Sequence, residues 1–257
     1  MEKQGKSNAA NGLRVARGVW YVARRGPELP RLQTFSAFPR GANKLSAELL
    51  KVSPKDPEAS VIRYAAELIS RGNVVGVPTD TFYGLAADPF NLAAVEEIYH
   101  VKGRPENRAL PILVSSIEQT IPLTLDLPDN FLKLAQKFWP GALTLVVEAS
   151  NRLPLKVTAN TKRVALRWPN SSVACALIDA LSSPITGTSA NISGHPSSSN
   201  AHDLVAQLGE RLPLILDSGE TGASVSSTIV DLRKDEWRIV REGAVSLEEI
   251  SEVLDGN

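Results

Sequence analysis

Four short polar clusters carry residue types that could bind and activate a small substrate. The first lies at residues 77–85, VPTDTFYGL, where Thr79, Asp80, Thr81 and Tyr83 share one turn. Hydroxyl and carboxylate side chains in a turn commonly satisfy nearby backbone groups, so this cluster alone favours an ordinary turn. Its position directly after a strand-like apolar run makes it a candidate site, because ligand groups collect at strand ends in open α/β sheets.

The second cluster is KGRPENR, which places Lys102, Arg104 and Arg108 close together. Cations at the end of a helix interact favourably with its dipole, and this purely structural role is as well supported by the local sequence as a functional one. Gly103 and Pro105 break the helix at once, which puts the cations on a loop that could surround a polyphosphate. Such side chains can also stabilise the charge on a departing pyrophosphate.

The remaining clusters are a hydroxyl-rich segment and a set of arginines near strand ends. The segment TGTSANISG at 186–194 has neither the G-x-x-x-x-G-K nor the G-x-G-x-x-G pattern, so alone it favours a capped loop. Arg167 ends an apolar strand, although arginines at strand ends usually extend to solvent. Ser227 and Arg241 come from two late strands. Each signal is weak by itself.

The elements that must position these clusters alternate along the chain. Helices are expected at about 60–71, 91–102, 127–138, 173–181, 201–208 and from 246 onward, and strands at 74–77, 111–114, 143–147, 164–167, 185–188, 214–216, 228–230 and 237–240. Ser60 is expected to cap the first helix, Pro128 to lie in the first turn of the third, and Ser246 with Glu249 to form a capping box. The alternation predicts one mixed α/β domain with a layered sheet, and the helix-free stretches indicate antiparallel strands within it.

Composition argues against several kinds of site. The 28 basic and 28 acidic residues cancel, so no overall field favours nucleic acid or an anionic membrane. The three histidines have no partner at metal-ligand spacing, which argues against a zinc site. The lone Cys175 lies in an apolar run and is expected to be a buried thiol in a reducing compartment. No segment approaches the roughly 18 apolar residues of a membrane span, so a cytoplasmic protein is expected.

Residues 1–47 differ from the rest of the chain. They are rich in arginine, poor in acids and without sustained periodicity, which predicts a basic, disordered extension. An artefact of an early start codon, an organelle transit peptide and an arm that touches nucleic acid remain open alternatives. The catalytic domain is expected at 55–254.

The combination of motifs is far more specific than any one of them. PTDTFYGL, KGRP, WPGALTLV, VALRWP, TSANISG and SSTIVDL follow one another between about Ser60 and Leu254, and together they resemble the YrdC/TsaC family of threonylcarbamoyl-AMP synthases. The resemblance is to the single-domain form. It implies a single YrdC-like domain with a twisted, mixed parallel and antiparallel sheet, flanked by helices around a concave basic cavity.

The resemblance also implies an activity. Members condense L-threonine, bicarbonate and ATP into L-threonylcarbamoyladenylate and pyrophosphate, which is a nucleotidyltransferase reaction, with Mg²⁺ carried on the nucleotide. A partner transferase complex then modifies adenosine at position 37 of tRNA, and direct contact of the synthase with RNA is possible.

The family signature implies roles for individual residues. Lys102 and Arg104 would be catalytic. The threonine-side residues would be Thr81, Arg167, Ser189 and Ser227, and the nucleotide-side residues Lys102, Arg104, Arg108, Asn191, Ser199 and Arg241. Three positions depart from the family: Arg108 stands where many members have Asn, Leu113 replaces a threonine-contacting histidine, and Arg163 replaces a small hydroxyl residue. Within the first cluster, Thr79 and Asp80 are expected to shape the turn and Tyr83 to wall the pocket.

Two other functions compete with the synthase. An RNA-binding or ribosome-maturation module of the same fold is favoured by the Arg-rich N-terminal segment and disfavoured by the zero net charge. A carbamoyl-transfer domain of the hydrogenase-maturation type shares the fold, but this chain lacks the acylphosphatase and zinc-finger-like segments of those proteins.

Overall fold

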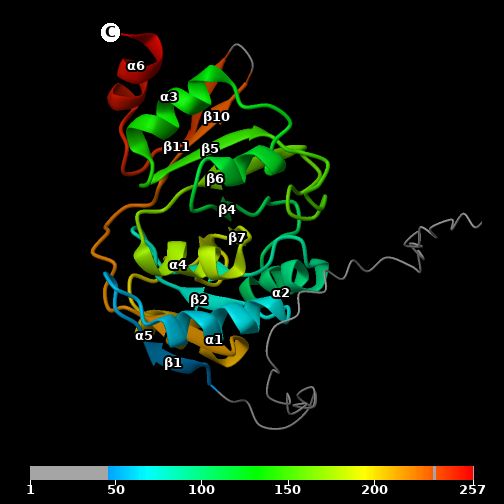
Figure 1. Ribbon diagram of the computed structural model, residues 1–257, viewed down its shortest axis with the longest axis vertical. Helices are drawn as coiled ribbons and strands as arrows, with labels where there is room; N and C mark the ends of the chain where they lie inside the picture. Colours follow the sequence, from blue (N-terminus) through cyan, green and yellow to red (C-terminus); the bar gives the residue numbers. More distant parts are fainter. Residues whose placement is uncertain (1–45, 234–235, 257) are drawn as a thin grey trace, which may run out of the picture. The chain divides into compact units, whose positions relative to one another are not determined.

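The structure is a computed structural model that describes residues 46–233 and 236–256. Its helices are α1 (Ala59–Ser70), α2 (Leu92–Lys102), α3 (Asp129–Phe138), α4 (Ser172–Leu181), α5 (Ala201–Leu208) and α6 (Leu247–Asp255), with the 3-10 helices η1 (Glu118–Leu123) and η2 (Gly209–Arg211). Its strands are β1 (Glu48–Lys51), β2 (Val75–Val77), β3 (Gly84–Ala86), β4 (Ile112–Leu113), β5 (Leu143–Glu148), β6 (Arg163–Arg167), β7 (Ile185–Thr186), β8 (Thr188–Ser189), β9 (Leu214–Asp217), β10 (Thr228–Leu232) and β11 (Trp237–Arg241) (Figure 1). The predicted mixed α/β class is confirmed.

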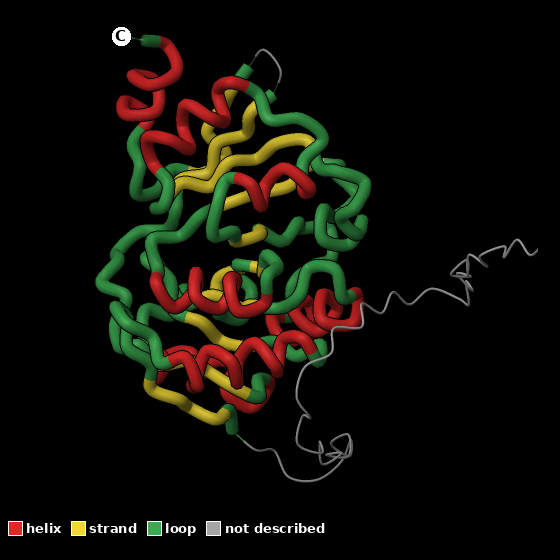
Figure 2. The backbone as a smooth tube through the Cα atoms, viewed as in Figure 1, coloured by secondary structure: helices red, strands yellow, loops and turns green. Residues whose placement is uncertain are grey.

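The strands form two mixed sheets instead of the one layered sheet expected from sequence. The five-stranded sheet has the order β1-β9-β2-β3-β8, and the six-stranded sheet has the order β11-β10-β5-β6-β4-β7. Strand β2 runs parallel to β9 and antiparallel to β3, while β5 runs parallel to β10 and antiparallel to β6. Figure 2 shows most of the six-stranded sheet toward the top of the view and the five-stranded sheet toward the bottom.

The strand predicted at 185–188 is divided between the two sheets. Strand β7 pairs with β4 in the six-stranded sheet, and β8 pairs with β3 in the five-stranded sheet. Gly187 lies between them, and a Cβ there would come within 2.4–2.9 Å of the Leu113 side chain. The chain therefore changes sheets at a residue where the packing leaves no room for a side chain.

Two hydrophobic clusters hold the helices on the sheets. Helices α1 and α4 pack together, and Ile69 and Leu177 belong to the cluster that includes the central strands of the five-stranded sheet. On the six-stranded sheet, Leu143 and Leu145 of β5 point into the cluster that contains Phe131 of α3. Because side chains alternate along a strand, the intervening residues of β5 point to the opposite face.

The helix ends agree only in part with the sequence predictions. The capping box of Ser246 and Glu249 is confirmed at the start of α6. Ser60 does not cap α1, because the helix begins at Ala59 and its N-cap lies two residues earlier, at Glu58. Pro128 is the N-cap of α3, which places it just before the first turn instead of within it. Gly103 ends α2 in the left-handed conformation, at φ 57°, so the KGRP loop leaves the helix directly after Lys102.

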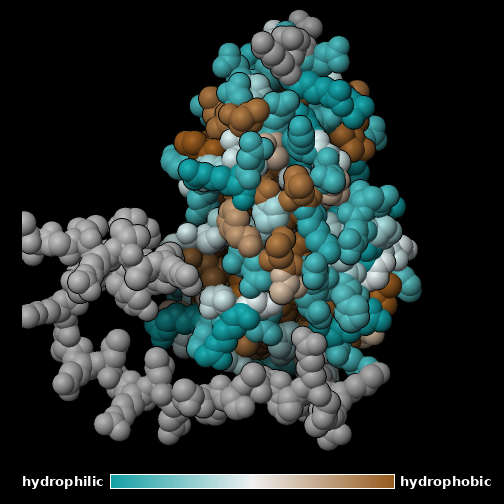
Figure 3. Space-filling model, turned by 90° about the vertical axis from the view of Figure 1, so that its right-hand side faces the viewer, coloured by the Kyte–Doolittle hydropathy of each residue, from teal (hydrophilic) through white to brown (hydrophobic). Residues whose placement is uncertain are grey.

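The folded part begins ahead of residue 55, because β1 pairs in parallel with β9. The predicted extension at 1–47 falls almost entirely outside the described residues. Across 46–233 and 236–256, no helix combines the length and apolar character needed to cross a bilayer. On the face drawn in Figure 3, hydrophobic residues occur in small groups separated by hydrophilic ones.

Candidate active site

A cavity of about 680 Å³ is lined by residues of both sheets and their connecting loops. Cavities of this size hold ligands as large as a nucleotide. One side is the face of the six-stranded sheet that points away from its hydrophobic cluster, which we call the sheet wall. It consists of Leu113, Thr144, Val146, Arg163, Ala165, Arg167, Ser227, Ile229, Asp231, Arg238, Val240 and Arg241.

The other side consists of turns, loops and short strand ends, which we call the loop wall. It is formed by Thr79, Thr81, Phe82, Tyr83, Gly84, Arg104, Ala109, Pro111, Gly187, Thr188, Ser189 and Ser197. Three of the four polar clusters found in the sequence thus meet on this wall, facing the arginines of the sheet wall.

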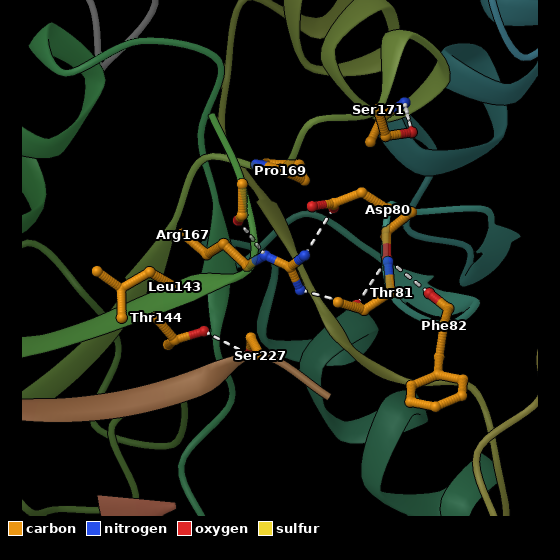
Figure 4. Close-up of polar contacts among 12 residues, drawn as sticks. Asp80, Thr81, Phe82, Leu143, Thr144, Arg167, Pro169, Ser171 and Ser227 are labelled. Carbon is orange, nitrogen blue, oxygen red and sulfur yellow. Dashed lines mark hydrogen bonds and ion pairs between the residues drawn. The ribbon is translucent and has the colours of Figure 1, made fainter. Parts of the chain in front are cut away.

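Arg167 connects the two walls. Its Nε donates to the Gly141 carbonyl at 2.9 Å, Nη1 to the Thr81 hydroxyl at 2.9 Å, and Nη2 to the Asp80 carboxylate at 2.6 Å (Figure 4). The residue is 6% exposed. Burial lowers the pKa of Arg167, and the Asp80 charge opposes that shift. Arg167 therefore presents a fixed, desolvated cation at one end of the cavity.

The PTDT turn is held by its own side chains. Thr79 Oγ1 donates to the Phe82 carbonyl at 2.7 Å and accepts from the Thr81 amide at 3.2 Å. Thr79 thus shapes the turn, as the sequence suggested, whereas Asp80 serves as the ion-pair partner of Arg167, which sequence reasoning missed. This arrangement leaves the Thr81 side chain on the cavity surface.

Ser227 is held from three sides on the sheet wall. Its hydroxyl lies 2.9 Å from Thr144 Oγ1, and Arg241 Nη2 donates to the Ser227 carbonyl at 2.7 Å and hydroxyl at 3.0 Å. Burial lowers the pKa of Arg241, and the Arg167 charge adds to the shift. Behind them, a Cβ on Gly243 would lie 2.3–2.5 Å from the backbone of residues 226–228, so only glycine fits. The two arginines make this end of the cavity strongly positive.

Arg104 brings a third cation from the loop wall. Its Nη2 donates to the Ala109 carbonyl at 2.9 Å and its Nε to the Arg108 carbonyl at 3.4 Å, so the KGRP loop folds back on itself. Burial lowers the pKa of Arg104. The bonds to its own loop fix the guanidinium where it faces the cavity.

The structure brings six of the ten predicted site residues to the cavity surface: Thr81, Arg104, Arg167, Ser189, Ser227 and Arg241. Lys102 and Asn191 lie behind the loop wall, where the Lys102 ammonium donates to Asn191. Arg108 is exposed, and it takes part in the loop through its backbone: its carbonyl accepts from Tyr99 and Arg104, and its amide donates to the Pro105 carbonyl. Ser199 accepts a backbone bond from Thr221, and its neighbour Ser197 lines the cavity instead.

Both sheet-wall departures from the family pattern line the cavity. Leu113 stands beside Arg167 on the adjacent strand. Arg163 donates to the Asp231 carboxylate and to the Leu232 carbonyl. Asp231 also pairs with Arg238 at 3.2 Å and Arg233 at 3.5 Å.

Sequence reasoning missed this ionic group and most of the sheet wall. Asp231 and its arginine partners line the wall together with the apolar side chains of Val146, Ile229 and Val240, and Val146 is paired with Asp231 on the adjacent strand. The period of two along β5, β6 and β10 was the signal that could have found these residues.

The cavity offers cations and hydroxyls but few metal ligands. Asp231 is the one carboxylate on its surface among the described residues, and arginines surround it. In the same part of the chain no three His, Cys, Asp or Glu residues come together as a metal site. The site is therefore built to bind anions.

Comparisons with known proteins identify the family of this chain. The sequence profile of the Sua5/YciO/YrdC family, described as telomere recombination, matches residues 67–243. A threonylcarbamoyl-AMP synthase of Pyrococcus abyssi is 40% identical over 193 residues, which cover 75% of this chain and 57% of the relative. A threonylcarbamoyl-AMP synthase of Bacillus subtilis is 38% identical over 205 residues, covering 79% of this chain and 58% of the relative.

A solved structure gives the same result. The crystal structure of P. abyssi Sua5 complexed with L-threonine has a TM-score of 0.78 and 38% identity to this chain, covering 81% of it and 61% of that protein. The chain thus spans less than two thirds of the length of these relatives. With a profile match over most of its length and these identities, the chain belongs to the Sua5/YciO/YrdC family.

Proposed function

We propose that this protein is a threonylcarbamoyl-AMP synthase. It would condense L-threonine, bicarbonate and ATP into L-threonylcarbamoyladenylate, with release of pyrophosphate and water. Membership in the family and the names of the P. abyssi and B. subtilis relatives support this activity. The cation-rich, hydroxyl-lined cavity supports it independently, because each of the three substrates carries an anionic group, which in threonine is the carboxylate.

The observation that carries the proposal is the buried guanidinium of Arg167. Arginine has five N–H donors, and within the described part of the chain the bonds to Gly141, Thr81 and Asp80 leave one on each terminal nitrogen. Paired N–H donors match the two oxygens of a carboxylate. They would bind the carboxylate of L-threonine, a ligand with which the P. abyssi relative was crystallised.

Hydroxyl groups would orient the rest of the amino acid. Thr81 contacts Arg167 directly, and Ser227 is bonded to Thr144 of β5, the strand that pairs with the strand of Arg167. Ser189 approaches from the loop wall. The nucleotide would lie between Arg104 and Arg241, whose charges offset those of the triphosphate.

Besides Lys102, three predicted nucleotide-side residues have no direct place in this arrangement. Arg108 is exposed, so it would reach only phosphates that extend out of the cavity. Asn191 accepts from the hydroxyl of the lining residue Ser189 and would act through it. Ser199 is half-buried and does not line the cavity, although Ser197 does.

The chemistry suits a site without a strong general base. The threonine amine adds to bicarbonate to give a carbamate and water, and a carbamate oxygen then attacks the α-phosphorus of ATP. The new O–P bond replaces the bond to the β-phosphate bridging oxygen, whose electron pair leaves with pyrophosphate. Arg104 would stabilise that charge, and holding the reactants in line can contribute roughly 7–11 kcal/mol in favourable cases.

Mg²⁺ would enter with the nucleotide as part of the substrate. Phosphate oxygens and water hold Mg²⁺ in many nucleotide sites. The only carboxylate on the surface of the described cavity, Asp231, is already paired with Arg163, Arg233 and Arg238, so the chain would add little to that coordination.

The product fits a wider role in tRNA modification. A labile adenylate must pass to an acceptor, which we propose is a transferase complex that forms N6-threonylcarbamoyladenosine at position 37 of tRNA. The enzyme would be a nucleotidyltransferase that acts in the cytoplasm.

The activity can be tested directly with the full chain. Purified protein is incubated with ATP, bicarbonate and labelled threonine, and both threonine-dependent pyrophosphate and the labelled adenylate are expected. Arg104→Ala should lower pyrophosphate release about 100-fold, the scale on which one electrostatic stabiliser acts. Arg152→Ala, at an exposed loop position, is the matched control.

Two outcomes would contradict the proposal. Release at the parent rate by Arg104→Ala would remove that residue from the mechanism. Salt-sensitive RNA binding without any threonine-dependent pyrophosphate would favour the RNA-binding function instead.

A further inference from the structure

The ammonium of Lys102 is enclosed by a single loop. Lys102 is the last residue of α2, and it is 1% exposed. Its Nζ donates to the carbonyl of Ser189, to the carbonyl of Asn191 at 2.8 Å and to the side-chain oxygen of Asn191 at 3.4 Å. An ammonium has three N–H donors, so these contacts use its full capacity.

The loop at 189–193 is tied to Lys102 through the backbone as well. The Ser193 amide donates to the Lys102 carbonyl at 2.9 Å. Within the loop, the Ser189 hydroxyl donates to the Asn191 side-chain oxygen at 2.6 Å. Asn191 Nδ2 in turn donates to the carbonyls of Ile192 at 2.8 Å and His195 at 2.7 Å. The Lys102 ammonium is therefore one centre of a closed hydrogen-bond network.

This network ends at the cavity surface. Ser189 lines the cavity, whereas Lys102 and Asn191 do not. The Ala190 amide donates to the Tyr83 carbonyl at 2.7 Å, which joins the same loop to the PTDTFYG segment. Any displacement of the loop would therefore move Ser189 and disturb the neighbourhood of Thr81.

We propose that Lys102 is a positioning residue, which sets the place of Ser189 through the loop and makes no contact with the nucleotide. This inference rests on the proposed synthase function and assigns the lysine of the KGRP signature a different task from that of Arg104. Arg104 faces the substrates, and Lys102 holds the wall against which they bind.

The chemistry of a buried lysine agrees with this assignment. Burial lowers the pKa of Lys102 to about 7, and the Arg104 charge adds to the shift. The three oxygen acceptors oppose it, because they favour the charged form. An arginine could not replace it, since a planar guanidinium does not fit three acceptors arranged around one point.

The first experiment combines kinetics with a mutant cycle. Lys102→Met, Ser189→Ala and the double variant are compared with the parent in threonine-dependent pyrophosphate release, with Lys133→Met, an exposed lysine of α3, as control. We expect Lys102→Met to raise the KM for threonine at least tenfold in the parent. In the Ser189→Ala background the same substitution should raise that KM less than twofold. Full additivity, with a loss confined to kcat, would overturn the proposal.

A second measurement reports on the stability of the loop at 189–193. Hydrogen exchange of the amides at 190–193 should be at least tenfold faster in Lys102→Met than in the parent and in Lys133→Met. Unchanged exchange in a folded Lys102→Met variant would contradict the positioning role, whether or not the protein proves to be a synthase.

A third measurement needs no variant, in case Lys102→Met fails to fold. The ¹³Cε resonance of Lys102 is followed in the parent protein while a non-hydrolysable ATP analogue is added. Its titration midpoint should rise, because the triphosphate offsets the Arg104 charge, but the Lys102 ammonium should show no scalar coupling to ³¹P across a hydrogen bond. Such a coupling would mean direct contact with phosphate and would overturn the proposal. If the parent itself releases no pyrophosphate, the synthase proposal fails, and the exchange data still decide the role of Lys102.

Discussion

The two walls of the cavity are built in different ways. Residues of the sheet wall are placed by strand pairing, because alternate side chains of β5, β6 and β10 face the cavity while the others enter the core. Residues of the loop wall are placed by side chains that donate to carbonyls, as Thr79, Lys102 and Arg104 do. The sheet wall therefore depends on the whole fold, and the loop wall depends on a few individual side chains.

The largest effect should come from Arg167, which joins the walls. Arg167→Ala removes the partner of Asp80, a carboxylate whose side chain is 15% exposed, and of the Thr81 hydroxyl. Breaking a largely buried pair costs roughly 3 kcal/mol, and the carboxylate of threonine would lose its only predicted cation. Urea unfolding should show that loss, and calorimetry should show threonine affinity reduced more than 100-fold. An unchanged threonine affinity would contradict the assignment.

The second-largest effect is expected for a substitution at Gly243, which packs against the backbone of the sheet wall, and it should lower the free energy of unfolding. Gly243→Ala places a Cβ against the backbone of residues 226–228, which cannot yield as a flexible side chain would. We expect the free energy of unfolding to fall by about 2–3 kcal/mol, with Ser227 displaced. Gly84→Ala is the loop-wall counterpart, since its nearest atom would be 3.5 Å away, and it should cost less than about 1 kcal/mol. Equal costs for the two variants would refute the contrast between the walls.

The close packing of Gly187 against Leu113, where the loop wall meets the sheet wall, can be tested by a double-mutant cycle. Gly187→Ala should cost about 1–2 kcal/mol, because the new methyl group meets Leu113. In a Leu113→Ala background the same change should cost less, since the space has been vacated. The coupling energy, read from chemical denaturation of the four proteins, should exceed about 0.5 kcal/mol. Simple additivity would show that the two side chains do not compete for the same space.

The smallest predicted effect is a pH dependence on the loop wall. The pKa of Lys102 in the folded protein is about 7, below its ordinary value, so above pH 7 the unfolded chain binds more protons than the folded one. Stability should therefore rise with pH above 7 in the parent and rise less in Lys102→Met. Denaturant unfolding at pH 7, 8 and 9 measures both slopes. Parallel slopes would indicate that the three oxygen acceptors keep the ammonium charged.

The sequence predicted the positions of helices and strands better than the assignment of the strands to two sheets. The helix and strand periods located α2, α3, β5 and β10 within a few residues, because these elements bury one face. Strands β1 and β3 were missed, because β1 adjoins the segment interpreted as an extension and β3 follows the PTDT turn at once. The division of 185–188 between two sheets follows from long-range pairing with β3 and β4, which local sequence does not encode.

Some residues of the candidate site could be predicted from the sequence motifs, and others only from the fold. Motif resemblance selected Thr81, Arg104 and Arg167, all of which line the cavity. It could not separate residues on the surface from residues behind it, because Lys102 and Ser189 carry equally strong signals in the family motif. Asp231 belongs to no recognised role in that motif, and its three arginine partners became visible only when β6, β10 and β11 were paired.

The passage of the chain through Gly187 ties the two walls of the cavity together at one corner. One residue of extended chain spans roughly 3.3 Å, so β7 and β8 cannot move apart at that point. Residues 218–227 form a much longer connection between β9 and β10, and its first two residues bond to the Tyr83 hydroxyl, next to β3 of the same sheet as β9. The two sheets are therefore joined by one residue at Gly187 and by ten residues at 218–227.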